Sequence, residues 1–105
     1  MTDSKNFKAV VAGTGAYLPE KILTNQELEK KLDTSDAWIV ERTGIRERRI
    51  AAKDECASSM AAKAGRHALE AGGLDAKEVD LIIVCTSSPD VLFPSTACFV
   101  QNELE

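Results

Sequence analysis

Trp38, the only tryptophan of the chain, is followed four residues later by Arg42 within residues 33–43 (Asp-Thr-Ser-Asp-Ala-Trp-Ile-Val-Glu-Arg-Thr). Residues four apart share a face of a helix, so a helix here would place Thr34, Trp38 and Arg42 on one stripe. An indole ring offers a π face to a planar base, and a guanidinium can bond phosphate oxygens in a bidentate manner. This stripe could therefore bind a nucleotide.

A structural role accounts for the same spacing. The tryptophan would anchor its helix on the core, and Arg42 would pair with a nearby carboxylate such as Glu41 or Glu47. Spacing alone favours this interpretation over nucleotide binding. Arginine is also concentrated just beyond the stripe, because Arg46, Arg48 and Arg49 follow Arg42 within eight residues. Such a cluster more often forms a solvated, partly ion-paired face than an anion site.

Gly13 and Gly15 follow a short apolar run, as they would in a dinucleotide-binding loop. The third position of that fingerprint is occupied by Leu18 rather than glycine, and Pro19 stands where a helix should begin. We therefore expect these glycines to permit a tight turn or close packing.

Histidine and cysteine provide the other candidate reactive groups. His67 lies off the alanine-rich face of a predicted helix, which favours a solvent-facing position over general-base work. Cys98 falls in the first turns of another helix, where amide dipoles can lower a thiol pKa, but its neighbours are apolar and no base is near in sequence. Cys56, Cys85 and Cys98 lack metal-site spacing, so we expect each to be a reduced, small buried hydrophobe.

Composition sets the broad class. The chain has 105 residues, of which 44% are hydrophobic and 29% charged, as in a soluble globular protein of at most one small domain. A net charge of −4 argues against a nucleic-acid binder. No run of about 20 apolar residues could span a membrane, and the start lacks the apolar core of a secretion signal. These observations predict a cytoplasmic protein that contacts neither nucleic acid nor membrane.

Start and stop signals predict four helices around these residues. A capping box at Thr24 and Glu27 opens the first, which should end near Asp33; Thr34 or Ser35 caps the second, which stops at Gly44. Asp54 is the expected cap of the third, a long helix with one alanine-rich face. The predicted ranges are 24–33, 34–44, 54–73 and 94–105.

Apolar runs predict strands at residues 7–12 and 79–86, and residues 45–50 look extended. The run Leu-Ile-Ile-Val-Cys at residues 81–85 is typical of a strand buried on both faces of a parallel sheet. Strand, helices, strand and helix give the βαβα order of a parallel α/β sheet. Two strands cannot bury a core on both faces, so we expect the sheet to be incomplete within residues 1–105.

Several strings together resemble the β-ketoacyl-acyl carrier protein synthase III family, which has a thiolase-like fold. They are residues 13–19 (Gly-Thr-Gly-Ala-Tyr-Leu-Pro), 24–25 (Thr-Asn), 33–48 and 93–95 (Phe-Pro-Ser), in the expected order. The Trp-Ile-x-x-Arg-Thr-Gly-Ile-x-x-Arg pattern within residues 38–48 is the most specific. The resemblance implies that residues 1–105 are the N-terminal part of a thiolase-like α/β domain, with a parallel or mixed sheet layered with helices.

The resemblance also implies an activity and a site. Enzymes of this family are acyltransferases that condense an acyl-CoA primer, typically acetyl-CoA, with malonyl-acyl carrier protein, and so initiate type II fatty acid synthesis. By this resemblance Trp38 would stack on the CoA adenine, and Arg42, helped by Thr34 and Thr43, would hold the phosphates. Phe93 would reach the primer pocket of the partner subunit in a homodimer. The implied partners are acyl-CoA and acyl carrier protein, without a cofactor or metal.

The family's catalytic cysteine, histidine and asparagine match no residue of this chain, and Cys98 lies one helix too early. We therefore expect residues 1–105 alone to be inactive. Two alternatives remain open: another CoA-using condensing enzyme, such as a secondary-metabolite starter synthase, or a noncatalytic module that binds CoA or another nucleotide.

Overall fold

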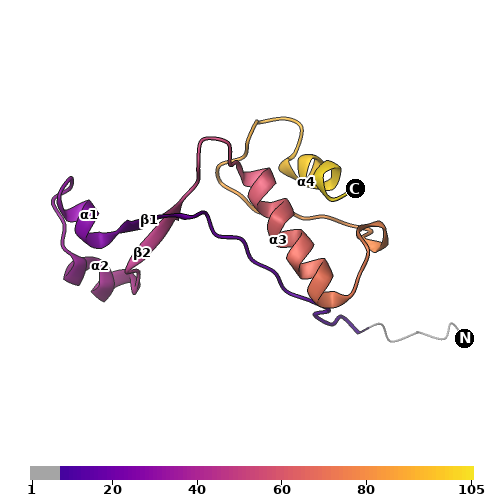
Figure 1. The fold of residues 1–105 in the computed structure, drawn as a ribbon, viewed down its shortest axis with the longest axis horizontal. Coiled ribbons are helices and arrows are strands. Elements are labelled where there is room, and N and C mark those ends of the chain that lie inside the picture. The colour runs from indigo at the N-terminus through magenta and orange to yellow at the C-terminus, as the bar shows by residue number, and fades with distance from the viewer. Residues whose placement is uncertain (1–7) are drawn as a thin grey trace, which may run out of the picture.

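The computed structural model of the chain describes residues 8–105, which run through the elements labelled in Figure 1. In chain order these are β1 (Lys21–Thr24), α1 (Asn25–Glu29), α2 (Asp36–Thr43), β2 (Glu47–Ile50), α3 (Ala57–Gly72), the 3-10 helix η1 (Ala76–Glu78) and α4 (Thr96–Leu104).

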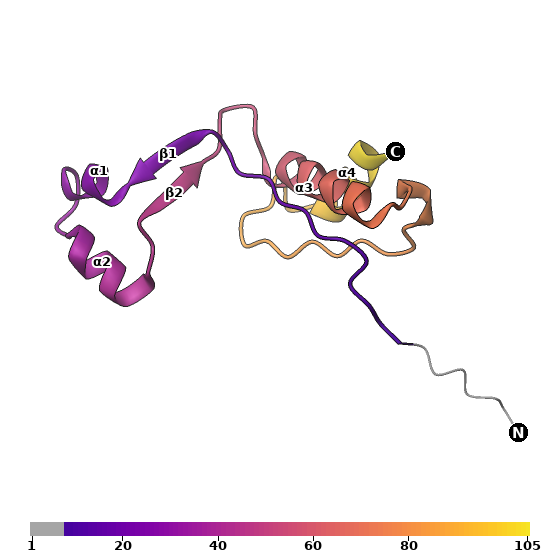
Figure 2. The same cartoon turned by 60° about the horizontal axis from the view of Figure 1, so that its bottom comes forward.

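The molecule is elongated and has two parts. Its extents are 66 × 31 × 26 Å, and its radius of gyration of 18.7 Å exceeds the roughly 13 Å of a compact chain of this length. Residues 20–50, here called the arm, contain β1, α1, α2 and β2, whereas residues 57–105, here called the body, contain α3 and α4 (Figures 1 and 2). Most packing between elements lies within one part or the other.

The arm is built on a two-stranded antiparallel ladder. β1 pairs with β2 in a register that sets Lys21 opposite Ile50 and Thr24 opposite Glu47. The extended segment expected at residues 45–50 is thus confirmed for residues 47–50, whereas residues 21–24 form a strand that the sequence did not predict. Thr24 and Glu27 form the predicted capping box, with reciprocal bonds of 3.3 and 2.9 Å. α1 nevertheless ends at Glu29, before Asp33.

The ends of α2 agree with the sequence. Ser35 caps it, because its hydroxyl accepts a hydrogen bond of 3.1 Å from the Trp38 amide. At the other end Gly44 adopts a left-handed φ of 72° and its amide donates to the Val40 carbonyl over 2.8 Å. Only glycine takes this conformation without strain, which explains why the helix stops there.

In the body, α3 packs against α4. Ala62 of α3 is fully buried and Val100 of α4 is 4% exposed, so small and β-branched residues form the contact between the helices. The cap of α3 is Cys56, not Asp54 as expected, because residues 52–55 form a turn in which the Glu55 amide donates to the Ala52 carbonyl. The helix ends at Gly73, as predicted.

The alanine-rich face of α3 receives the segment around Gly13 and Gly15. A Cβ built on Gly15 would lie 2.3 Å from the Ala64 carbonyl oxygen, and one built on Gly13 would lie 2.3 Å from that of Ala68. Backbone thus meets backbone here, which confirms close packing as the role of these glycines.

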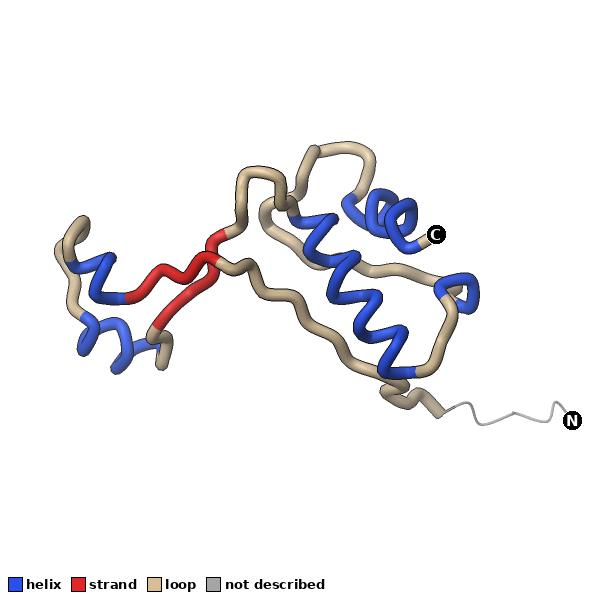
Figure 3. Tube along the Cα trace, viewed as in Figure 1, coloured by secondary structure: helices blue, strands red, loops and turns tan. Residues whose placement is uncertain are grey.

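The strands expected at residues 7–12 and 79–86 are absent from residues 8–105; residue 7 lies outside the described range. Residues 8–12 and 79–86 are drawn as loop in Figure 3. Side chains alternate at residues 81–84, where Ile82 and Val84 are half-buried while Leu81 and Ile83 are 74% and 76% exposed. The backbone is therefore extended but lacks a hydrogen-bonded neighbour. Within residues 8–105 the sheet is the antiparallel β1–β2 ladder of the arm, not a parallel sheet.

Helices in the described part of the chain are too short or too polar to cross a membrane.

Candidate functional site

Trp38 and Arg42 form a stacked pair on the outer side of α2. The Arg42 guanidinium carbon lies 4.9 Å from the centroid of the Trp38 ring, within the range of a cation–π contact. Trp38 is 53% exposed, while its neighbour Ile39 is 9% exposed and faces the interior of the arm. One helix face thus holds the arm together and the other presents an indole and a guanidinium to solvent.

This geometry contradicts the structural interpretation of the pair. A tryptophan that anchored its helix would be buried, and an arginine in a structural ion pair would have a carboxylate within reach. Instead Trp38 is exposed, and no ion pair to Arg42 is formed within residues 8–105; Glu47 lies 4.0 Å from Arg49. Arg42 covers one face of the indole, and the exposure of Trp38 leaves area on which a second planar group could stack.

Thr34 and Thr43 flank this pair but differ from the expected arrangement. Thr34 precedes the cap Ser35, so it lies outside α2 and not on its stripe; its amide donates to the Leu32 carbonyl over 2.9 Å. The Thr43 hydroxyl donates to the Ile39 carbonyl over 2.7 Å and accepts from the Ile45 amide over 3.0 Å. It satisfies backbone groups at the end of the helix, so a phosphate contact through Thr43 would need that hydroxyl to leave them.

A buried asparagine that the sequence analysis did not single out as a site residue holds the pair in place. Asn25 is fully buried, and its side-chain amide donates to Asp36 over 2.7 Å and to the Ile45 carbonyl over 2.8 Å. Its oxygen accepts from Arg48 over 2.9 Å. Asn25 thereby joins α1, the start of α2 and β2; its position after the cap Thr24 was the only signal.

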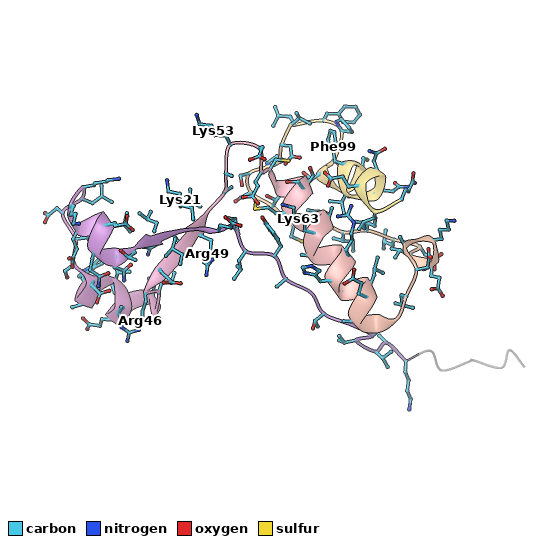
Figure 4. All side chains as sticks on the ribbon, in the orientation of Figure 1. Lys21, Arg46, Arg49, Lys53, Lys63 and Phe99 are labelled. Atoms are coloured by element: carbon cyan, nitrogen blue, oxygen red, sulfur yellow. The ribbon has the colours of Figure 1, made fainter. Side chains whose placement is uncertain are left out.

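The four clustered arginines have separate roles. Arg48 binds Asn25, and Arg49 donates to the Pro19 carbonyl over 3.0 Å besides lying near Glu47. The predicted ion pairing is confirmed for Arg49, whereas Arg48 bonds a neutral side-chain amide. Arg42 stacks on Trp38, and Arg46 is exposed near α2 (Figure 4). Of the four arginines, Arg42 and Arg46 are therefore the two that remain available to an anion at this end of the arm.

The other candidate residues lie away from this pair. Phe93 is 88% exposed in the loop before α4, and its neighbour Leu92 is 98% exposed. His67 is exposed, as expected, with its Nδ1 2.8 Å from the Ala16 carbonyl oxygen, to which the Nδ1–H tautomer donates.

The three cysteines are free thiols and all are exposed, so the expectation that they are buried is wrong. Cys85 lies on the exposed side of the unpaired segment 79–86. Cys98 borders an open cleft between α3 and α4. The Ser58 hydroxyl, followed by Ser59, lowers the pKa of the Cys56 thiol. Residues 8–105 contain no cluster of three or more acidic, histidine or cysteine side chains arranged to hold a metal ion.

The cap of α2 supports the site directly, so Ser35→Ala should lower the free energy of unfolding by about 1 kcal/mol. The Trp38 amide would lose its partner, and the first turn, which carries the indole, would fray. Urea denaturation measures the change. Ser87→Ala, in an exposed loop, is the matched control and should leave stability within about 0.5 kcal/mol. Equal effects of both substitutions would contradict the capping role.

Known proteins resemble this chain closely. It is 61% identical over 94 residues to the β-ketoacyl-[acyl-carrier-protein] synthase III of Methylococcus capsulatus. The matched residues make up 90% of this chain and 29% of that relative. The crystal structure of 3-oxoacyl-[acyl-carrier-protein] synthase III from Aquifex aeolicus superposes with a TM-score of 0.82 at 55% identity, over 89% of this chain and 30% of that structure. The chain is thus similar to β-ketoacyl-acyl carrier protein synthase III. The resemblance expected from the sequence is confirmed, and with it the thiolase-like fold class.

The chain spans about 30% of the length of these synthase III relatives. A second kind of condensing enzyme also has this fold: the priming β-ketosynthase from the R1128 polyketide biosynthetic pathway matches with a TM-score of 0.82 at 40% identity, over 90% of this chain and 28% of that structure. No protein-family model matches the chain.

Proposed function

We propose that this chain is part of a β-ketoacyl-acyl carrier protein synthase III, an acyltransferase that condenses an acyl-CoA primer with malonyl-acyl carrier protein by decarboxylative Claisen condensation. The primer is typically acetyl-CoA, and the reaction initiates type II fatty acid synthesis. The observation that carries the proposal is the exposed Trp38 ring with the Arg42 guanidinium stacked on it, within a chain so similar to synthases of that name.

The chain's own residues would bind the primer's carrier and would not perform the chemistry. Trp38 offers its free ring area to the adenine of CoA, and Arg42 offers two parallel N–H donors to a phosphate. Thr34 precedes the cap of α2 and lies off its stripe, so we assign it at most an assisting contact made from outside the helix. Thr43 supports the end of the helix, so we assign it a weaker part. Phe93, projecting from its loop, suits contact with the primer pocket of a partner subunit.

A chimera tests this proposal. Residues 1–105 would replace the matching segment of the Methylococcus capsulatus synthase, and release of CoA from acetyl-CoA in the presence of malonyl-acyl carrier protein would be followed. We expect condensation, because the grafted segment supplies a primer-binding edge of the same kind. The native Methylococcus capsulatus enzyme is the positive control. A chimera that folds, as judged by circular dichroism, but releases no CoA under these conditions would count against the proposal.

The second candidate is a starter synthase of secondary metabolism, favoured by the match to the priming β-ketosynthase of a polyketide pathway. A panel of acyl-CoA primers offered to the same chimera separates the two. Preference for acetyl-CoA supports the fatty acid role, whereas strong preference for a longer or branched primer supports the starter synthase. Binding of CoA without turnover of any primer would support a noncatalytic binding module.

A further inference from the structure

The connection between the arm and the body runs through two extended segments. Residues 17–20 lead into β1, and residues 51–56 lead from β2 to α3 (Figures 1 and 2). At the arm end the two segments are tied together, because Arg49 donates to the Pro19 carbonyl over 3.0 Å and Pro19 is buried. The arm therefore moves as a unit with Pro19, and its angle to the body depends on what holds the next few residues.

Three side chains meet at this point, one from each passing segment and one from α3. The Tyr17 hydroxyl donates to the Glu55 carboxylate, and Lys63 of α3 reaches the same carboxylate oxygen over 3.3 Å. The Lys63 ammonium also lies 4.2 Å from the centroid of the Tyr17 ring. Each of the three residues therefore contacts the other two.

Glu55 is the centre of this set. Its second oxygen accepts from the Ala52 amide over 2.9 Å, which fixes the carboxylate on the turn that leaves β2. The Glu55 side chain is only 10% exposed, compared with 41% for Lys63, so the contact is partly shielded from water. Shielded, hydrogen-bonded pairs hold geometry better than exposed ion pairs.

We propose that Tyr17, Glu55 and Lys63 form a clamp that sets the angle between the arm and the body, and with it the placement of Trp38 and Arg42. The three contacts tie the two connecting segments to each other and to α3, and the main packing between elements lies on either side of this junction. The clamp depends only on contacts within the chain, so a test of the clamp is independent of the condensing activity.

Charge limits the pH range over which the clamp is closed. The Ala52 amide, then the Tyr17 hydroxyl and Lys63, lower the pKa of Glu55, whereas Tyr17, followed by Glu55, raises the pKa of Lys63. Glu20, Lys21 and Asp54 face the same cavity, of about 480 Å³. A carboxylate with a lowered pKa stops stabilising the clamp as the pH falls through that pKa. An ammonium with a raised pKa stops stabilising it as the pH rises through that pKa. The clamp should therefore be closed at neutral pH.

The arm angle can be measured with groups that the chain already has. Trp38 in the arm is the only tryptophan and serves as the fluorescence donor. In a Cys56→Ser, Cys98→Ser background, an acceptor attached to exposed Cys85 reports from the segment beside α3. Time-resolved energy transfer then gives the distribution of distances between arm and body. At neutral pH we expect one narrow distribution.

Glu55→Ala should abolish the narrow distribution, because it removes the centre of the clamp. Asp54→Ala is the matched control: it removes a neighbouring carboxylate of the same cavity that takes no part in these contacts, so the distribution should stay narrow. Tyr17→Phe keeps the ring against Lys63 and loses the hydroxyl, and should broaden the distribution less. Acidifying the unsubstituted protein through the lowered pKa of Glu55 should broaden it as well, because the protonated carboxyl loses its charged contacts.

Two results would overturn the clamp: a broad distribution in the unsubstituted protein at neutral pH, or a narrow one in Glu55→Ala. If Glu55→Ala loses its helical circular dichroism, Tyr17→Phe decides, and an unchanged distribution in that variant also overturns the proposal.

Discussion

Gly15→Ala should destabilise the chain by about 1–3 kcal/mol or more, the usual cost of forcing extra atoms into a packed site. The new Cβ would lie 2.3 Å from the Ala64 carbonyl oxygen and 2.4 Å from the Ala68 amide nitrogen. Both are backbone atoms of α3, so no side chain can rotate away to make room. Either the segment around Gly15 leaves the helix or the helix shifts, and urea denaturation would record the loss.

Gly65→Ala is the matched control for this substitution. Gly65 lies within α3, and a Cβ there would meet the Leu104 side chain at 3.6 Å, an ordinary contact. Alanine is favoured over glycine inside a helix by up to about 1 kcal/mol, so this variant should be as stable as the parent or more stable. The same chemical change is thus expected to act with opposite sign at the two positions. If Gly15→Ala were harmless, the close approach of backbone to backbone would be wrong.

Trp38→Ala and Arg42→Ala should each weaken CoA binding by about 1–3 kcal/mol, or roughly 5- to 150-fold in affinity. The first substitution removes the aromatic surface for the adenine, and the second removes the donor to phosphate. Because Arg42 also stacks on Trp38, each residue orders the other. The double variant should therefore lose less than the sum of the two single losses. Isothermal titration of CoA into the chimera measures all three.

Two further variants make the binding result specific. Arg42→Lys keeps the positive charge but loses the planar group, so its affinity should fall between those of the parent and Arg42→Ala. Arg66→Ala removes an exposed arginine from α3 in the body and should leave CoA affinity unchanged. Unchanged affinity in both Trp38→Ala and Arg42→Ala would take these residues out of the site.

Helix ends were predictable because their signals are local. The capping hydroxyls of Thr24 and Ser35, and the left-handed Gly44, act within four residues of the groups that they satisfy. The cap of α3 was misassigned for a related reason. Asp54 is a better cap by type than Cys56, but a turn held by Glu55 and Ala52 moves the start of the helix two residues onward.

Strands and tertiary contacts were less predictable because they depend on partners far away in the chain. Residues 81–85 have the composition of a buried strand, yet composition does not supply the neighbour that a ladder needs. The role of Asn25 could not be foreseen either, since its partners lie 11 to 23 residues further on. For the site, spacing placed Trp38 and Arg42 on one face, and only the structure showed that the ring is exposed.

The unpaired segment 81–85 affects how this chain behaves in concentrated solution. Its outward side carries Leu81 and Ile83, and it contains no charged residue and no proline. Its backbone offers free amides and carbonyls along both edges, which is the pattern that templates cross-β association between copies. Self-association through this segment would leave the helices intact, so a circular dichroism spectrum would show added β signal before any helical signal was lost.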